Sequence, residues 1–255
     1  MSTCFPNGPE NVAVLDTTPT PESATARGLE ACAALREMLG GVRRPQQTVL
    51  EQLGNALQRA VEIAVASIAL VVTWPVMLLI AAIVRLDSPG PPLFVQLRVG
   101  RNGRLFRFWK FRTLYVDARS RFPELYSYTY TEEEIQRLRF KREQDPRVTC
   151  VGRWLRKSTL DELPNFWNVL KGNVALVGPR PEIPEMVPNY APEQLIKFTV
   201  RPGITGLAQT NGRGNLAFQQ TIAYDIEYVK HKSLWLDVKL IAKTIMLLAR
   251  FDGAF

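Results

Sequence analysis

The stretch from Ile63 to Val84 contains no charged residue, and it constrains the fold of this chain more than any other feature. About 20 consecutive apolar residues are enough for a helix to cross the hydrocarbon core of a bilayer. In a soluble protein, a helix of this composition would have to be buried on all sides, which is the alternative interpretation. We therefore predict a membrane-embedded helix.

Pro75 lies in the middle of this stretch. Proline removes one backbone hydrogen bond and its ring clashes with the preceding turn, so a kink or break is expected there. At 1.5 Å per residue, each half of the stretch reaches only about 15 to 18 Å, whereas the hydrocarbon core is about 30 Å thick. The helix can therefore either cross the membrane with a kink or re-enter on the side from which it came.

Basic residues flank the stretch on both sides, and positive flanks prefer the cytoplasm. They are Arg43, Arg44 and Arg59 before it, and Arg85, Arg98, Arg101, Arg104, Arg107, Lys110 and Arg112 after it. A crossing helix would place one flank outside, whereas a re-entrant helix keeps both inside. The charge distribution therefore favours a re-entrant membrane helix that is broken at Pro75.

Charge and composition limit the chemistry of the chain. The formal net charge of +8 indicates polyanionic partners, which are nucleic acid, anionic lipid or a phosphorylated substrate. The three cysteines form no CxxC pair, and His231 is the single histidine. A disulfide framework, a thiolate or multi-histidine metal site and a histidine-based triad are therefore not expected. We expect His231 on a helix surface, and carboxylates in the role of nucleophile or acid and base.

Local patterns predict several smaller elements. The segments 92–100 and 104–114 are rich in Phe, Val and Leu and predict two strands, joined by a turn at Asn102-Gly103, with a basic face. Residues 119–144 predict a solvated, charged helix. Two helical runs follow Ala217, and the apolar face of the second predicts core packing, a dimer contact or an interfacial membrane helix.

Two adjacent carboxylates, Asp161 and Glu162, lie in the basic segment KSTLDELPNFWNVLK. The spacing from Thr159 to Glu162 matches a capping box, so the pair can be explained as the cap of a helix. The surrounding arginines suggest chemistry instead, because guanidinium groups suit bidentate contacts with phosphate. These are Arg153 and Arg156 upstream, with Lys157 beside them, Arg180 in Gly-Pro-Arg-Pro, and Arg201 in Arg-Pro-Gly. Such a site would let a divalent ion neutralise a pyrophosphate that a carboxylate attacks.

Three long motifs carry a resemblance to a known family. They are FWKFRTL (108–114), DPRVTCVGRWLRKSTLDELPNFWNVLKGNVALVGPRPE (145–182) and RPGITGLAQTNGR (201–213). From about Thr48 onward the chain resembles the bacterial sugar transferase family, the monotopic polyprenyl-phosphate phosphoglycosyl transferases. The segments DIEYV, SLWLDVK and GAF near the end are similar to the branch that initiates exopolysaccharide synthesis.

The resemblance implies a two-step reaction with Mg²⁺ bound at the site. Asp161 would attack the β-phosphate of a UDP-sugar, release UMP and hold the sugar phosphate; it would also be the metal ligand. Glu162 would position the acceptor phosphate or assist proton transfer. Lys110, Arg112 and Arg180 would bind phosphates of the donor or of undecaprenyl phosphate, the acceptor.

The expected architecture follows from both lines of reasoning. We expect a mixed α/β fold, predominantly helical with a small hairpin or sheet, in a monotopic protein on the cytoplasmic face of the bacterial inner membrane. Residues 1–47 would be a flexible N-terminal extension, in which Gly28–Leu39 could form a short helix closed by Gly40 and Gly41. Residues 48–87 would be an amphipathic lead-in and the re-entrant helix, and residues 88–255 the catalytic domain with a C-terminal amphipathic helix. A homodimer is reasonable, and nucleic acid is not an expected partner.

Two other functions stay open at the level of sequence. One is a polyprenyl-phosphate glycosyltransferase, which would transfer the sugar alone and release UDP. The other is a basic protein that binds membrane surfaces or nucleic acid through its arginines. The sequence does not distinguish galactose, glucose and N-acetylated sugars as the donor sugar.

Overall fold

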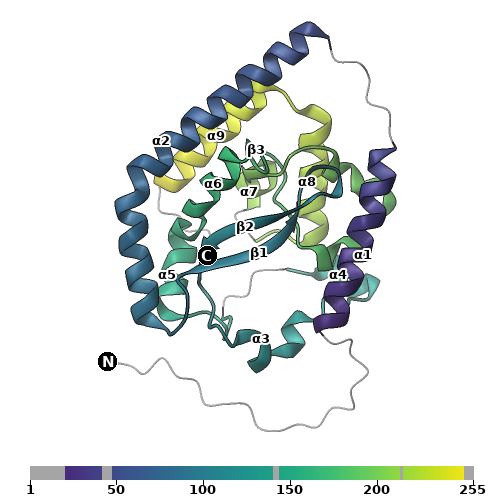
Figure 1. Cartoon of the computed structure of the whole chain (residues 1–255). Coiled ribbons are helices and arrows are strands. Elements are labelled where there is room, and N and C mark those ends of the chain that lie inside the picture. The colour runs from purple at the N-terminus through teal and green to yellow at the C-terminus, as the bar shows by residue number, and fades with distance from the viewer. Residues whose placement is uncertain (1–20, 42–47, 140–143, 213–214, 250–255) are drawn as a thin grey trace.

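The computed structural model describes residues 21–41, 48–139, 144–212 and 215–249 (Figure 1). Within these ranges the chain is mostly helical, and four short strands form two separate two-stranded sheets. The predicted class, a mainly helical mixed fold with a small hairpin, is therefore confirmed for the described part of the chain.

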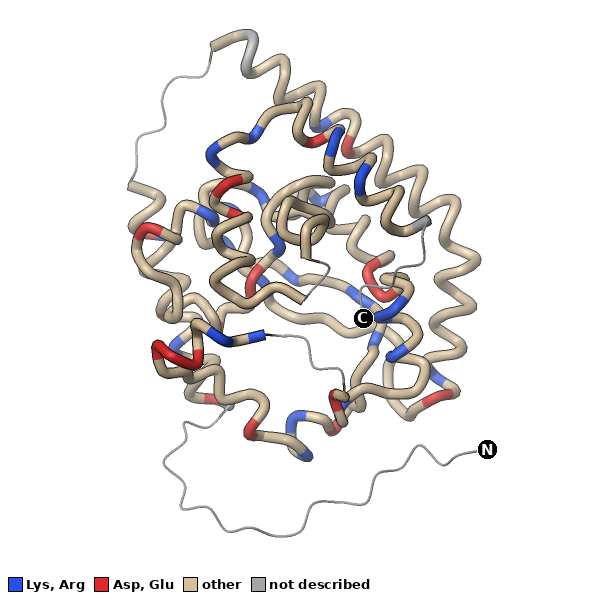
Figure 2. The backbone as a smooth tube through the Cα atoms, turned by 180° about the vertical axis from the view of Figure 1, so that it is seen from behind, with Lys and Arg blue, Asp and Glu red and all other residues tan. Residues whose placement is uncertain are grey.

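The apolar stretch lies inside one long helix, α2 (Val49–Asp87), which continues through Pro75. Figure 1 shows α2 bending part of the way along its length, and Figure 2 shows no charged position around the bend. The Thr73 hydroxyl donates to the Ala69 carbonyl at 2.6 Å, a contact that favours bending of a helix. The expected break at Pro75 is thus corrected to a bend, because helical hydrogen bonds continue on both sides of the proline.

The apolar side chains of α2 face outward. Only 11% of its most apolar window is buried inside the protein, and by length and composition the helix is able to cross a membrane. Val71 is 70% exposed and Ile68 is 64% exposed. A core helix of a soluble protein would be mostly buried, so this alternative is not supported.

Both ends of α2 are attached to the rest of the fold. Near its start, Arg59 donates to the carbonyl oxygens of the last two residues of α6 (Phe166–Leu170), in both cases at 2.7 Å. At its end, Arg112 donates to the carbonyl oxygens of Val84 at 3.3 Å and Ser88 at 2.7 Å. The two ends are therefore held by the same folded body.

The predicted hairpin is confirmed, but its basic residues do not share one face, because Arg107 and Lys110 lie on opposite faces of the second strand. Strands β1 (Leu93–Val99) and β2 (Leu105–Phe111) pair antiparallel, with the short 3₁₀ helix η1 (Arg101–Gly103) between them. Asn102 has φ 57° and Gly103 has φ 70°, the left-handed conformations that make this dipeptide suitable for a tight turn.

A second, parallel pair was not predicted. Strands β3 (Ala175–Val177) and β4 (Gly203–Thr205) lie side by side, and the Gly203 amide donates to the Pro179 carbonyl at 2.9 Å. This pairing brings the Gly-Pro-Arg-Pro turn next to the Arg-Pro-Gly turn. Three-residue strands show too little periodicity to be recognised in a sequence.

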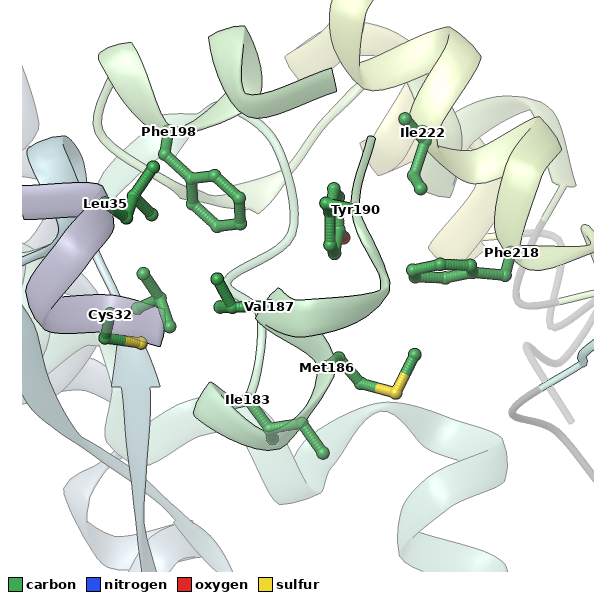
Figure 3. Packing of buried hydrophobic residues seen from close by; sticks show 10 residues of the cluster. Cys32, Leu35, Ile183, Met186, Val187, Tyr190, Phe198, Phe218 and Ile222 are labelled. Carbon is green, nitrogen blue, oxygen red and sulfur yellow. The ribbon is translucent and has the colours of Figure 1, made fainter. Parts of the chain in front are cut away.

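The N-terminal segment is more ordered than expected. Helix α1 (Pro21–Gly40) contains the short helix expected over Gly28–Leu39 but begins earlier, and it packs against η4 (Pro184–Asn189), so residues 21–40 are not a flexible extension. Cys32 and Leu35 of α1 face Val187 in the hydrophobic cluster drawn in Figure 3. Gly28 allows this contact, because a Cβ there would lie 2.5 Å from the backbone of η4. Residues 1–20 and 42–47 lie outside the described residues.

The remaining helical segments carry the site and the C-terminal face. They are α3 (Ala118–Arg121), η2 (Pro123–Tyr126), α4 (Glu132–Arg137), α5 (Cys150–Ser158), η3 (Leu160–Asn165), η5 (Pro192–Thr199), α7 (Leu207–Gly212), α8 (Phe218–His231) and α9 (Leu234–Ala249).

These helices test the sequence predictions in different ways. Helices α8 and α9 confirm the two predicted after Ala217, and His231 is exposed in the last turn of α8 as expected. The charged segment 119–144 is less helical than predicted, because α4 ends where Leu138 adopts a ψ of 124°. Residues 140–143 lie outside the described part.

Candidate active site

The acidic pair lies in η3, directly after α5. Thr159 at the junction has φ 58°, and this turn places Asp161 and Glu162 beside strand β2. The capping box expected as an alternative does not form: the Thr159 hydroxyl donates to the Ser158 carbonyl at 2.6 Å, and the Glu162 carboxylate accepts from Arg180. The pair is therefore not explained as a helix cap.

Cations from four different elements surround the acidic pair. The electrostatic neighbours of Asp161 and Glu162 are Lys110 on β2, Arg98 on β1, Arg156 on α5 and Arg180 in the turn after β3. In the hairpin, Arg98 pairs with Phe106 and Phe94 pairs with Lys110, so Arg98 and Lys110 lie on the same face. The tertiary fold thus gathers positive charge around two carboxylates.

Asp161 is buried without a partner of its own. It is 7% exposed, and among the described residues it has neither a hydrogen bond nor an ion pair within bonding distance. Burial, reinforced by the negative charge of Glu162, raises the pKa of Asp161 to about 6, while Lys110 and Arg180 act in the opposite direction. At neutral pH it is a carboxylate whose oxygens remain available to bind or attack a substrate.

Glu162 differs from its neighbour in being paired. Arg180 donates to it at 2.7 Å. Burial by itself would raise the pKa of Glu162, but the Arg180 charge and hydrogen bond outweigh it and hold the pKa below its usual value. Glu162 is therefore ionised across the physiological range, and it orients the Arg180 guanidinium.

Lys110 and Arg98 are the two cations that the hairpin contributes to the site. Burial lowers the pKa of Lys110 to about 8, although the nearby Asp161 opposes this effect, so the amine stays mostly protonated at neutral pH. The Arg98 guanidinium stacks on the Phe108 ring, 5.4 Å from its centroid, and donates to the Pro181 carbonyl at 3.0 Å. The sequence interpretation gave Arg98 no role at the site; the hairpin register, which places it on the Lys110 face, was the signal that could have found it.

Two predicted phosphate ligands are used elsewhere, which corrects their expected role. Arg112 is 4% exposed and donates to backbone oxygens at the end of α2, where it closes the helix. Arg201 forms two hydrogen bonds with Glu62 of α2, at 2.7 and 3.0 Å. Both guanidinium groups are bonded to α2 or to residues just after it, and neither is bonded to the acidic pair. Arg153 is exposed on α5, and no contact joins it to the pair among the described residues.

The residues fit a magnesium ion held together with substrate. Within the described ranges, no three His, Cys, Asp or Glu side chains converge as a complete metal cage. Magnesium is usually bound by one or two carboxylates together with substrate phosphates. The free oxygens of buried Asp161, next to Glu162, suit this second kind of site.

Comparison with known proteins gives consistent matches. A family model described as bacterial sugar transferase matches residues 53–250. The galactosyl transferase CpsE of Streptococcus agalactiae is 39% identical over 77% of this chain and 43% of its own length. The undecaprenyl-phosphate galactose phosphotransferase of Salmonella typhimurium is 34% identical over 83% of this chain and 44% of its own length.

A third relative is similar in length. The exopolysaccharide production protein ExoY of Rhizobium meliloti is 34% identical over 83% of this chain and 94% of its own length. This chain therefore spans less than half of the first two relatives and nearly all of the third.

Proposed function

This chain belongs to the bacterial sugar transferase family, and on that premise we propose that it moves a sugar 1-phosphate from a UDP-sugar to undecaprenyl phosphate and releases UMP. The single observation that carries the proposal is Asp161, a buried carboxylate with free oxygens and three cationic neighbours, Lys110, Arg156 and Arg180. A nucleophile that must attack a diphosphate needs such surroundings, because its own negative charge would otherwise repel the substrate.

The first step forms a bond between an Asp161 oxygen and the β-phosphorus of the donor. The bond from that phosphorus to the bridging oxygen breaks, and UMP leaves with the oxygen and its electron pair. Arg180 and Lys110 are placed to stabilise the charge that develops on the phosphate oxygens. The product is an aspartyl phosphosugar.

The second step regenerates the carboxylate. A phosphate oxygen of undecaprenyl phosphate attacks the same phosphorus, the bond to Asp161 breaks, and undecaprenyl diphosphate sugar leaves. Glu162, held by Arg180, would position the acceptor phosphate or accept its remaining proton. Asp161, next to Glu162, would hold a magnesium ion, and this ion would supply further charge neutralisation.

We place the protein on the cytoplasmic face of the inner membrane, with α2 as a re-entrant helix. The arrangement of α2 supports this, because Arg59 ties its start and Arg112 ties its end to one folded body. A helix that crossed the membrane would hold its two ends on opposite sides. The exposed apolar face of α9, which includes Trp235 and Val238, is also available for a homodimer or a membrane surface.

The test uses purified protein in nanodiscs with magnesium, undecaprenyl phosphate and UDP-galactose, UDP-glucose or an N-acetylated UDP-sugar. We expect UMP release with one donor, a loss of at least about a thousandfold in Asp161→Asn, and a smaller loss in Glu162→Gln. Asp117→Asn changes an exposed aspartate whose ionic partner is Arg121; it is the matched control and should keep its activity. Release of UDP would show transfer of the sugar alone, and full activity in Asp161→Asn would refute the mechanism.

A further inference from the structure

Next to the turn that carries Arg180 lies a largely buried polar cluster that the reaction does not use directly. It consists of Glu182, Tyr190, Lys197 and Asp225. Lys197 is 3% exposed and Asp225 is 1% exposed. Lysine and aspartate are rarely buried to this degree, so the cluster calls for an explanation.

The cluster is one connected network. The Lys197 ammonium donates to the Tyr190 hydroxyl at 2.9 Å and lies 3.0 Å from an Asp225 oxygen. The Tyr190 hydroxyl donates in turn to Glu182 Oε2 at 2.7 Å, and Lys197 Nζ lies 3.7 Å from the same oxygen. Tyr190 therefore links the buried lysine to Glu182.

Glu182 connects this network to the candidate site. Its backbone carbonyl accepts from the Val99 amide at 2.8 Å, which joins the turn to strand β1. Arg180 lies two residues earlier, between Pro179 and Pro181, whose rings restrict the backbone of the turn. Arg180 and Lys197 also line one small pocket. A shift of Glu182 would therefore move the guanidinium that contacts Glu162.

Stability alone does not account for such a network. Buried ion pairs cost desolvation energy, and well-packed apolar residues in their place are often equally or more stable. Hydrogen bonds, in contrast, fix position and direction, which apolar contacts do not. The Tyr190 ring already packs against aromatic side chains, since the rings of Phe198 and Phe218 lie 5.3 and 5.2 Å from it. This packing involves the ring and not the hydroxyl.

We infer that Tyr190 and Lys197 are positioning residues, which hold Glu182 and thereby the turn that presents Arg180 to a phosphate group. This inference deepens the proposed function and rests on it, since it concerns how the same site holds a diphosphate. The two residues do not touch the reacting atoms; they act through Arg180.

The experiment measures the dissociation constant of pyrophosphate by calorimetry, with the full chain in nanodiscs. Tyr190→Phe keeps the ring and removes only the hydroxyl, and we expect it to weaken binding about fivefold, the effect of one hydrogen bond. Arg180→Met should weaken binding at least about tenfold. The double variant should match Arg180→Met within about twofold, because the hydroxyl acts through that arginine.

Tyr228→Phe is the matched control. Tyr228 is also a buried tyrosine bonded to an aspartate, since its hydroxyl donates to Asp237 of α9 at 2.8 Å. The hydroxyl also lies 3.2 Å from the Val177 carbonyl, but Val177 is held by the pairing of β3 with Thr205 of β4, and Asp237 does not lie in the turn. The dissociation constant of Tyr228→Phe for pyrophosphate should stay within about twofold of the wild type.

The lysine variants are a second test. Lys197→Arg should bind pyrophosphate nearly as well as the wild type, and Lys197→Met should bind it at least as weakly as Tyr190→Phe. If Lys197→Met does not fold, the tyrosine variants decide.

Four results would overturn the inference. These are unchanged binding in Tyr190→Phe, an equal loss in Tyr228→Phe, additive losses in the double variant, and a wild type that does not bind pyrophosphate. A wild type that binds pyrophosphate through Arg180 and responds to Tyr190→Phe, but releases no UMP, would contradict the proposed reaction and support this positioning role.

Discussion

Arg180 and Arg201 lie in two neighbouring turns that contain proline, and each pairs with a glutamate, yet their surroundings differ. Arg201 bonds twice to Glu62, which is 2% exposed and is also contacted by Arg59 at 3.2 Å. Arg180 makes one bond to Glu162, and its side chain remains 46% exposed. Arg201 and Glu62 are thus bonded to each other inside the fold, whereas the Arg180 side chain is accessible to a substrate.

The same contrast separates two cations of the FWKFRTL segment (108–114). Both terminal nitrogens of Arg112 donate to backbone oxygens at or just after the end of α2, while Lys110, two residues earlier, is an electrostatic neighbour of the unpartnered Asp161. A charge whose partners are all present in the fold stabilises that fold. A charge with unused bonding capacity is available for chemistry, and four predictions test this division.

Arg201→Met should have the largest effect on stability. It leaves buried Glu62 with Arg59 as its remaining ionic partner among the described residues, so the free energy of unfolding should fall by about 2 to 4 kcal/mol. Arg180→Met removes a half-exposed pair and should cost about 1 kcal/mol or less. Urea unfolding in detergent measures both, and the KM for the donor should rise with Arg180→Met and not with Arg201→Met. The opposite pattern would reverse the roles of the two arginines.

Arg112→Met should lower the free energy of unfolding by about 2 to 3 kcal/mol, because buried carbonyl oxygens at the end of α2 lose their donor. Lys110→Met should change stability by less than about 1 kcal/mol but reduce kcat/KM by about a hundredfold, since it removes a cation from the reacting phosphate. Thermal unfolding and UMP release compare the two variants directly. Equal losses of activity at equal stability would mean that Arg112 also belongs to the site.

Asp161→Asn should stabilise the protein above pH 6. The pKa of Asp161 rises from 3.8 to about 6 on folding, so its contribution to stability is fully present below pH 3.8 and is lost as the pH rises through 6. Removing the charge should therefore raise the free energy of unfolding by about 2 kcal/mol at pH 7.5, where the carboxylate is ionised, and by little at pH 4. Urea titrations at the two pH values measure this, and a loss of stability at pH 7.5 would mean that Asp161 is a satisfied structural residue.

The smallest expected effect is a shift in the pH profile. The ionised form of Asp161 and the protonated form of Lys110 are both required, so kcat/KM should rise through pH 6 and fall above pH 8. Lys110→Met removes a charge that lowers the pKa of Asp161, so its acidic limb should move to higher pH, by less than about one unit. A pH-rate series on both proteins checks this. An acidic limb at the same pH in both would show that the charge of Lys110 does not act on the pKa of Asp161.

Much of the fold was predictable where the signal is local. The hairpin follows from Asn102-Gly103, because these two residues adopt positive φ readily. The outward-facing apolar helix follows from its hydropathy. Helix α1 was underestimated, because its stability comes from contacts with η4, which lies far away in the sequence.

The site was predictable only in part for the same reason. The acidic pair and Arg180 were found from motifs, and the structure brings them together. Arg98 was missed because its role depends on strand register, and Tyr190 and Lys197 were missed because their partners lie on other elements.

The sequence by itself determined a long apolar helix with a proline inside it, a tight hairpin and a pair of carboxylates in a basic chain, because each of these depends on neighbours a few residues away. Only the tertiary structure decided which cation meets which carboxylate. Glu62 and Arg201, for example, are 139 positions apart. Charge pairing depends on the distance between the charges in space and on their burial, and both are defined only once the chain has folded.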